Sequence, residues 1–76
     1  MQYKTITLGL LESHPKLHER LRLSRKLLSE LDRYATELRT AHLRWKGEGL
    51  DPSAAMELAV EELQTRIAQE AERYEA

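Results

Sequence analysis

Two histidines in the N-terminal third of the chain have the spacing of a metal-binding pair. His14 and His18 are four residues apart, so a helix could direct both imidazoles toward one ion, and Glu12 and Glu19 lie nearby. A zinc site needs at least three protein ligands, and His14 precedes Pro15, where a helix would only be starting. We therefore predict no metal here and assign the two histidines to a helix cap and a solvated surface.

A third histidine falls on the apolar face of a predicted helix. His42 lies between Leu38 and Trp45, at a position where a leucine would complete the pattern. A pH-sensitive contact is one interpretation, but we favour a partly buried histidine that hydrogen-bonds across an interface and fixes its register. Ser24 lies on the same face and has no histidine or acid spaced to make it a nucleophile. Trp45 and Tyr34 could anchor a partner, although a plug in a core or interface is the simpler interpretation.

The chain carries no motif of catalysis or cofactor binding. The glycines of residues 47–52 lack the flanking strand, the third glycine and the lysine of a phosphate-binding loop. Glu57, Glu61 and Glu62 have no matching Glu-x-x-His motif of a di-iron bundle. Without cysteine there is no disulfide framework, cysteine-based zinc site or thiol nucleophile. We predict a protein that is not an enzyme and binds no cofactor.

Basic residues concentrate in one short stretch, where they could contact phosphate groups of RNA or DNA. They are Lys16, Arg20, Arg22, Arg25 and Lys26. No aromatic residue is interleaved for base stacking, and no helix-turn-helix signature is present. The alternative interpretation is a solvated face that pairs with an acidic last helix. The formal net charge of −1 provides no general attraction to nucleic acid or to anionic lipid.

The elements that must position these residues are helices. Between Pro15 and Trp45, positions separated alternately by four and three residues form the seam of a long helix that packs against another helix. The seam consists of Leu17, Leu21, Ser24, Leu28, Leu31, Ala35, Leu38, His42 and Trp45. Leu27, Tyr34 and Ala41 widen this stripe beyond that of a two-stranded coiled coil, which favours a bundle.

Local signals divide the chain into three helices. Residues 2–12 fit either a helix or a strand, and we favour a helix because no other segment is typical of a strand. Pro15 suits the first turn of a helix. Gly47 can form a left-handed cap at a helix end, and Asp51 indicates the start of the next helix. The predicted elements of a single all-α domain, residues 1–76, are a short helix at 2–12, a long helix at 15–46, a turn at 47–51 and a helix at 52–75.

The long helix would span ~48 Å, whereas a compact globule of this size has a diameter of ~30 Å. We therefore expect an elongated antiparallel hairpin. Two helices cannot enclose so wide a stripe and the N-terminal segment is too short to cover the rest, so we expect a second copy to form a dimeric four-helix bundle. Charge agrees with this pairing, because residues 15–46 carry a net charge of +5 and residues 47–76 a net charge of −6.

We predict a small helical module for protein–protein interaction, either a self-associating scaffold or a regulator that binds another helical protein. We expect the interface to consist of Leu17, Leu21, Leu28, Leu31, Tyr34, Leu38, His42, Trp45, Met56, Val60, Leu63 and Ile67. A cytoplasmic location follows from the lack of a long apolar run or a signal peptide. The alternative is a dimeric nucleic-acid-binding regulator that uses the basic first half of the long helix, and a steep loss of binding with salt would favour it.

Overall fold

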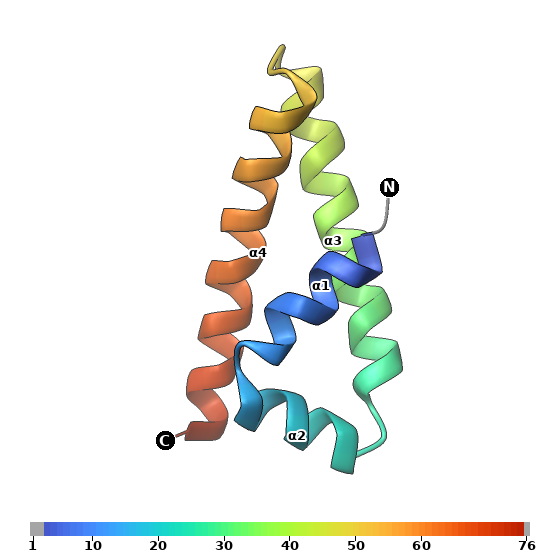
Figure 1. Cartoon of the computed structure of the whole chain (residues 1–76), viewed down its shortest axis with the longest axis vertical. Helices are drawn as coiled ribbons and strands as arrows, with labels where there is room; N and C mark the ends of the chain where they lie inside the picture. The colour runs from blue at the N-terminus through green and yellow to red at the C-terminus, as the bar shows by residue number, and fades with distance from the viewer. Residues whose placement is uncertain (1–2, 76) are drawn as a thin grey trace.

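The computed structural model describes residues 3–75, with side chains through residue 73, and this part of the chain is helical apart from three short connections. These residues form four helices and no strand: α1 (Tyr3–Glu12), α2 (Pro15–Leu23), α3 (Leu27–Gly47) and α4 (Pro52–Glu75) (Figure 1). The predicted all-α class is confirmed, and the ambiguous N-terminal segment is a helix. Gln2, which was predicted to begin that helix, lies outside the described residues.

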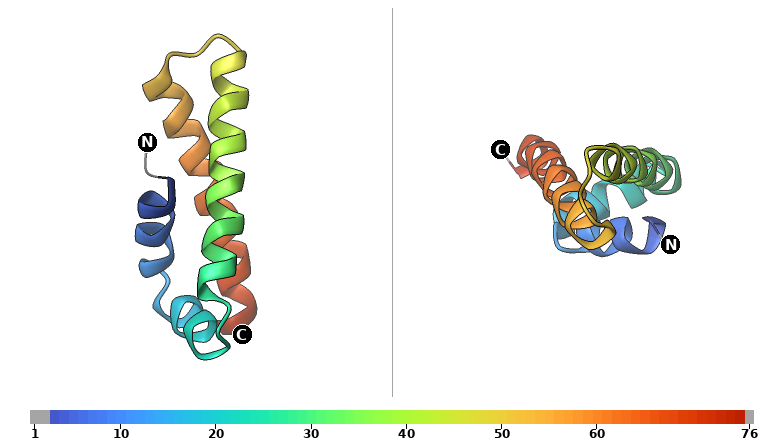
Figure 2. Two further views of the ribbon diagram at one scale, coloured as in Figure 1. Left: turned by 90° about the vertical axis from the view of Figure 1, so that its right-hand side faces the viewer. Right: turned by 90° about the horizontal axis from the view of Figure 1, so that it is seen from above.

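The helices α3 and α4 run in opposite directions and form the two long sides of the molecule. They converge at the turn of residues 48–51 and separate toward the other end, where α2 spans the gap between them (Figure 1). Two further views show that α1 lies across one face of this pair (Figure 2). The principal axes extend over 40 × 22 × 14 Å. The N-terminal helices therefore close the pair along one face and at one end.

All four helices contribute to one hydrophobic core. Its buried residues are Leu11, Leu17, Leu21, Tyr34, Leu38, Ala41, Ala59, Leu63, Ile67 and Ala71. Along α4, the buried positions change from Ala55 and Ala59 near the turn to Leu63 and Ile67 farther from it. Small side chains lie where α3 and α4 converge, and larger ones lie where the helices separate. From Ala55 to Ile67, side-chain size thus follows the distance between the two helices, and beyond this segment Ala71 is again small.

The predicted 15–46 helix is wrong, because the chain bends between α2 and α3. The bend is made at Arg25, whose backbone is left-handed with a φ of 60°. The Lys26 N–H donates to the Leu21 carbonyl at 2.9 Å, and the Arg25 N–H donates to the Arg22 carbonyl at 3.2 Å. This is the Schellman motif, in which a left-handed residue ends a helix and the last carbonyls receive new donors.

The bend changes how the apolar stripe is covered. We expected the N-terminal segment to be too short for this task and a second copy to supply the missing cover. That premise is wrong: α2 turns across the end of the α3–α4 pair, and α1 returns along its face (Figure 2). Leu11 of α1 and Leu17 and Leu21 of α2 are buried in the same cluster as the stripe. One chain therefore builds a closed core from its own helices.

The second break lies where it was predicted, although a different glycine makes it. Gly47 is the last helical residue of α3, and Gly49 takes the left-handed conformation with a φ of 97°. The Leu50 N–H donates to the Trp45 carbonyl at 3.4 Å, which is again the long hydrogen bond of a Schellman motif. The α3–α4 turn and the α2–α3 bend are therefore built on the same pattern.

The two predicted helix starts differ in how they are capped. Asp51 caps α4 as expected, since its Oδ1 accepts the backbone N–H groups of Ser53 at 2.9 Å and Ala54 at 3.0 Å. The helix α2 begins after His14, whose side chain makes no capping hydrogen bond. The preceding residue, Ser13, has a hydroxyl of the kind that often caps a helix, but it donates this hydroxyl to the Leu10 carbonyl of α1 at 2.6 Å.

Candidate interaction surface

Most residues predicted to form an interface are packed within the fold of one chain. The buried members are Leu17, Leu21, Tyr34, Leu38, His42, Leu63 and Ile67. The half-buried members that pack against the same core are Leu31, Trp45, Met56 and Val60. Leu28 differs from all of them, because 77% of its surface is exposed. The structure therefore brings the predicted set together around one core and leaves Leu28 outside it.

The exposed leucine belongs to a corner of the molecule where α2 meets α3. Leu23, the last residue of α2, is 67% exposed, and Arg22, Arg25 and Lys26 beside it are exposed as well. We name Arg22, Leu23, Arg25, Lys26 and Leu28 the basic leucine corner. Leu23 and Leu28 are the two most exposed large hydrophobic residues in the described part of the chain, and they lie five residues apart. This corner is therefore the leading candidate site in the described part of the chain.

Helix geometry explains why both leucines face water. Successive residues are about 100° apart around a helix, so Leu23 points roughly 160° away from the buried Leu21. Leu28 lies only about 20° from the buried Ala35, seven residues later, and so belongs to the core-facing stripe. It is exposed because the bend at Arg25 carries α2 away from the stripe just before α3 begins. Its exposure is a direct result of the bend.

The positive charges of this region are largely free of acidic partners. Arg22 pairs with Glu19 of its own helix, and its hydrogen bonds lower the pKa of that carboxyl group. Within the described residues, no acidic side chain lies within ion-pair distance of Lys16, Arg25 or Lys26. The corner thus combines exposed apolar side chains with positive charge that is available to an outside partner.

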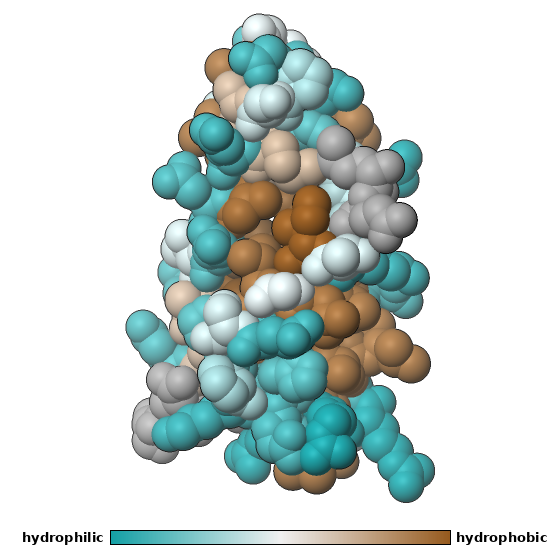
Figure 3. All heavy atoms as spheres, viewed as in Figure 1, coloured by the Kyte–Doolittle hydropathy of each residue, from teal (hydrophilic) through white to brown (hydrophobic). Residues whose placement is uncertain are grey.

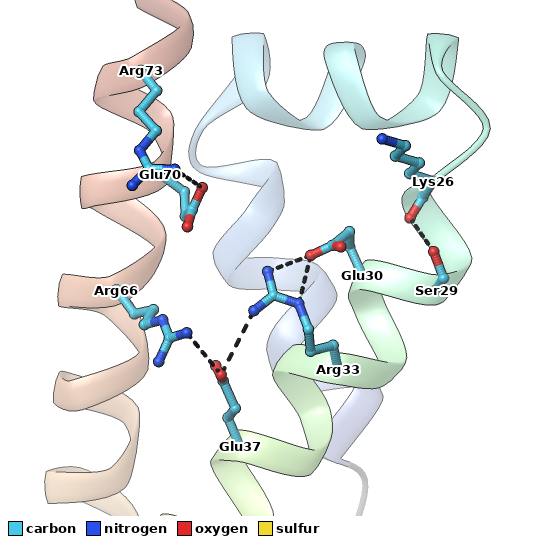
Figure 4. A network of polar contacts seen from close by, with 8 residues as sticks. All are labelled: Lys26, Ser29, Glu30, Arg33, Glu37, Arg66, Glu70 and Arg73. Carbon is cyan, nitrogen blue, oxygen red and sulfur yellow. Dashed lines mark hydrogen bonds and ion pairs between the residues drawn. The ribbon is translucent and has the colours of Figure 1, made fainter.

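The ion pairs that join α3 to α4 lie away from this corner. Glu37 of α3 pairs with Arg66 of α4 at 3.2 Å and also with Arg33 of its own helix (Figure 4), and Arg44 pairs with Glu62. Such exposed pairs contribute at most about 1 kcal/mol each. Glu37, Arg44, Glu62 and Arg66 also line a groove of about 280 Å³ between the helices. Because its charges are already paired, this groove is a weaker candidate than the basic leucine corner.

His42 is buried near the opposite end of α3 and connects three helices. Its Nε2–H donates to the Pro52 carbonyl at 3.3 Å, because a carbonyl oxygen can only accept, and Nδ1 then accepts the Tyr3 hydroxyl at 3.0 Å. The tyrosine and histidine rings meet edge to face, with centroids 5.9 Å apart. The register-fixing contact that we expected across an interface is therefore made between α1, α3 and the start of α4 of one chain.

The two aromatic residues considered as binding anchors lie in or beside the core. Tyr34 is only 2% exposed, with the Arg33 guanidinium 4.6 Å from its ring centre, and burial raises the pKa of its hydroxyl. Trp45 is half-buried, the Arg44 guanidinium lies 5.1 Å from its ring centre, and the Trp45 Nε1 has no hydrogen-bond partner among the described residues. Tyr34 is thus a core residue, and Trp45 plugs the core near the α3–α4 turn.

The remaining candidates for chemistry are separate from one another. Across the described residues, no three histidine or acidic side chains converge on a point that could hold a metal ion. Ser24 donates its hydroxyl to the Arg20 carbonyl at 2.9 Å, so it helps to end α2. Hydrophobic atoms do gather along the middle of the face shown in Figure 3, between α3 and α4 and beside α1. They surround the core rather than a reactive group.

The sequence predictions missed Leu23 and the role of its neighbours. Leu23 falls two residues after Leu21, off the periodic stripe, so the spacing assigns it to solvent. The signal that could have found the corner is the polar run at 24–26 between two pairs of leucines. Such a run permits a helix end even without glycine or proline.

No protein-family model, curated protein or solved structure matches this chain. Between residues 3 and 75, none of the helices has both the length and the apolar composition that crossing a bilayer requires. The function must therefore be inferred from the surface of this fold, on which the basic leucine corner is the leading candidate site.

Proposed function

We propose that this chain is a protein–protein interaction module that associates with a second copy of itself. The observation that carries the proposal is the exposure of Leu23 and Leu28, at 67% and 77%, at one corner of the fold. Fully burying a leucine contributes about 2 kcal/mol. Because Leu23 and Leu28 are already about a third and a quarter covered in the single chain, burying the remaining exposed surface in two copies would contribute about 6 kcal/mol before the costs of association.

The seam in the sequence supports a helical partner. The seam residues keep their alternating spacing of four and three from residue 17 to residue 45, across the bend at residues 24–26. Leu28 is the seam leucine that the single chain leaves uncovered. A second copy presents the same seam and the same uncovered leucine, so in a two-fold dimer the two leucines would cover each other. As a self-associating module, the chain would serve as a scaffold or as a small regulator of another helical protein.

The test is the molar mass in solution, measured by light scattering across a dilution series. We expect twice the chain mass of 8.9 kDa at high micromolar concentration, falling on dilution. The double variant Leu23→Ser/Leu28→Ser should stay monomeric with an unchanged helical circular dichroism spectrum, because both leucines face water in the single chain. Leu43→Ser removes a leucine that is 48% exposed elsewhere on α3, and this control should keep the dimer. A wild-type chain that remains monomeric at high micromolar concentration would refute the proposal.

A second candidate function is a dimeric nucleic-acid-binding regulator. The observation in its favour is that Lys16, Arg25 and Lys26 are exposed and pair with no acidic side chain among the described residues. They lie in the same stretch of sequence as Arg20 and Arg22. Binding of a short fluorescent RNA or DNA duplex, measured at low and at physiological salt, tests this candidate. Phosphate contacts predict a steep loss of affinity with salt and a weaker complex for Arg25→Ala/Lys26→Ala. No binding at low salt would exclude it.

A further inference from the structure

The bend between α2 and α3 places a residue other than glycine in the left-handed conformation. Arg25 has a φ of 60°, a left-handed conformation that is unfavourable for any residue with a Cβ atom and that glycine usually occupies. Ser24 and Lys26 on either side are neither glycine nor proline. The bend is thus a short, strained connection of three residues between two helices.

The apolar pattern runs straight through this connection. Leu21, Leu28 and Ala35 follow one another at intervals of seven residues, so in a straight helix they would share one face. In the bent chain Leu21 and Ala35 are buried, while Leu28 between them is 77% exposed. Straightening the bend would return Leu28 to the stripe and Arg25 to a right-handed conformation.

We infer that two copies of the chain exchange their α1 and α2 helices by straightening the bend at residues 24–26. In the exchanged dimer, α1 and α2 of each copy pack on α3 and α4 of the other, and α2 and α3 form one continuous helix. The core contacts are kept, since the exchanged helices find an identical surface on the second copy. This inference rests on the proposed self-association and gives it a mechanism.

Strain in the connection favours exchange over simple docking of two closed chains. Short hinges under strain promote domain swapping, because opening relieves the strain in both copies at once. Each straightened helix passes from one core to the other, so the two hinges approach each other at the two-fold axis. Leu23 and Leu28 of both copies then have apolar neighbours, which the closed single chain does not supply.

The charges of the basic leucine corner oppose this exchange. Arg22, Arg25 and Lys26 of two copies would come close together, and like charges at a surface repel until salt screens them. The exchanged dimer should therefore become tighter as salt is added. Binding of nucleic acid by the same residues would become weaker under the same conditions. Salt dependence thus separates the two candidate functions.

One ion pair reports directly on which chain supplies α1. Lys4 of α1 and Asp32 of α3 pair at 2.7 Å with both side chains exposed, so a carbodiimide can couple them into an amide. Without exchange the amide links residues of the same chain, whereas after exchange it links two chains. We would equilibrate a mixture of unlabelled and isotope-labelled chains, couple them, and identify the linked peptides by mass spectrometry. Asp32→Asn removes the carboxylate and serves as the control for this linkage.

Two variants at the hinge test the role of strain. Arg25→Gly accepts the left-handed conformation and weakens a straight helix, so it should raise the dimer dissociation constant on the order of 100-fold. Arg25→Ala removes the same charge but keeps the Cβ atom, and its dissociation constant should be equal to or lower than that of the wild type. Circular dichroism and light scattering on both variants provide the comparison.

Each outcome decides the inference. Isotope-mixed Lys4–Asp32 links together with a dimer weakened by Arg25→Gly alone would support exchange. A dimer whose links stay within single chains, and which both hinge variants affect equally, would overturn exchange and leave the proposed self-association standing. A wild-type chain that stays monomeric would overturn both.

Discussion

The helices α2 and α3 end in the same hydrogen-bond pattern, but only α3 has the residue that suits it. The left-handed residue is Arg25 after α2, with a φ of 60°, and Gly49 after α3, with a φ of 97°. A side chain can enter the left-handed region near φ of 60° at a cost of about 1 kcal/mol, whereas φ of 97° lies beyond that region and requires glycine. The α2–α3 bend is therefore strained, and the α3–α4 turn is not.

The surroundings of the two connections increase this difference. Beyond the Gly49 turn, the buried His42 hydrogen-bonds to Tyr3 and to the first residue of α4, and a carboxylate caps that helix. At the Arg25 bend no side chain at the N-cap position caps α3. Leu23 and Leu28 are exposed there, whereas Leu27 is half-buried against the core. The α3–α4 turn is fixed by buried polar contacts, whereas the α2–α3 bend is held by its backbone hydrogen bonds, by the Ser24 hydroxyl and by the packing of Leu27. The strained α2–α3 bend is thus the less firmly fixed of the two connections.

The largest effect is expected where the α3–α4 turn is fixed. His42→Ala removes a buried ring and leaves the Tyr3 hydroxyl and the Pro52 carbonyl without a partner. It should lower the free energy of unfolding by about 3 kcal/mol, measured by urea denaturation. Tyr3→Phe removes only the hydroxyl and should cost about 1 kcal/mol. If His42→Ala cost no more than Tyr3→Phe, the histidine would not be what fixes this turn.

The next largest effect is expected at the left-handed glycine. A Cβ atom at Gly49 would meet nothing within 4 Å, so the cost of Gly49→Ala comes from the backbone alone. With a φ of 97°, it should lower the free energy of unfolding by about 2 kcal/mol. Gly47 is helical and equally open, so Gly47→Ala should raise stability by up to about 1 kcal/mol. If Gly49→Ala and Gly47→Ala changed the free energy of unfolding in the same direction, Gly49 would not be the left-handed residue of this turn.

The sequence marks the second connection and not the first, for a reason of local chemistry. Glycine and an Asp-Pro pair within residues 47–52 each carry a conformational preference that ends or starts a helix. Residues 24–26 carry no such preference, and the seam spacing continues across them. The bend there is decided by tertiary packing: it lets Leu17 and Leu21 join the core of their own chain, worth about 4 kcal/mol against a strain of about 1 kcal/mol.

The residues of the candidate site, like the connections, could be predicted from the sequence only in part. The stripe residues Leu38, Leu63 and Ile67 are buried, as their spacing indicates. Periodicity shows that a side chain needs a neighbour, but it does not show whether the same chain or another copy supplies it. The exposed leucines depend on the position of the bend, so a prediction that lacked the bend could not find Leu23 or explain Leu28.

A smaller effect is expected at the cap of α4. Asp51→Ala removes the acceptor of two backbone N–H groups and should cost about 1 kcal/mol in the free energy of unfolding. Asp51→Asn keeps a carbonyl oxygen in the same position and should cost less than half as much. Thermal unfolding of the three proteins measures the difference. Equal losses in both variants would mean that the negative charge, rather than the cap, is what stabilises this helix start.

The smallest effect is expected at the strained bend itself. At concentrations where the chain is monomeric, Arg25→Gly should raise the free energy of unfolding by about 0.5 kcal/mol, because relief of the left-handed strain exceeds the added entropy of the unfolded chain. Arg25→Ala should give no gain, since it keeps the Cβ atom. Urea denaturation with matched protein concentrations measures both.

Combining Arg25→Gly with Gly49→Ala in one chain tests whether the two connections contribute independently to stability. They lie at opposite ends of α3, about 30 Å apart, so the effects of Arg25→Gly and Gly49→Ala should add in the double variant. Additive effects of opposite sign would show that each connection is governed by its own left-handed residue. A destabilising Arg25→Gly would instead mean that the arginine side chain contributes more to the closed fold than its backbone costs, and the bend would then be held closed rather than poised to open.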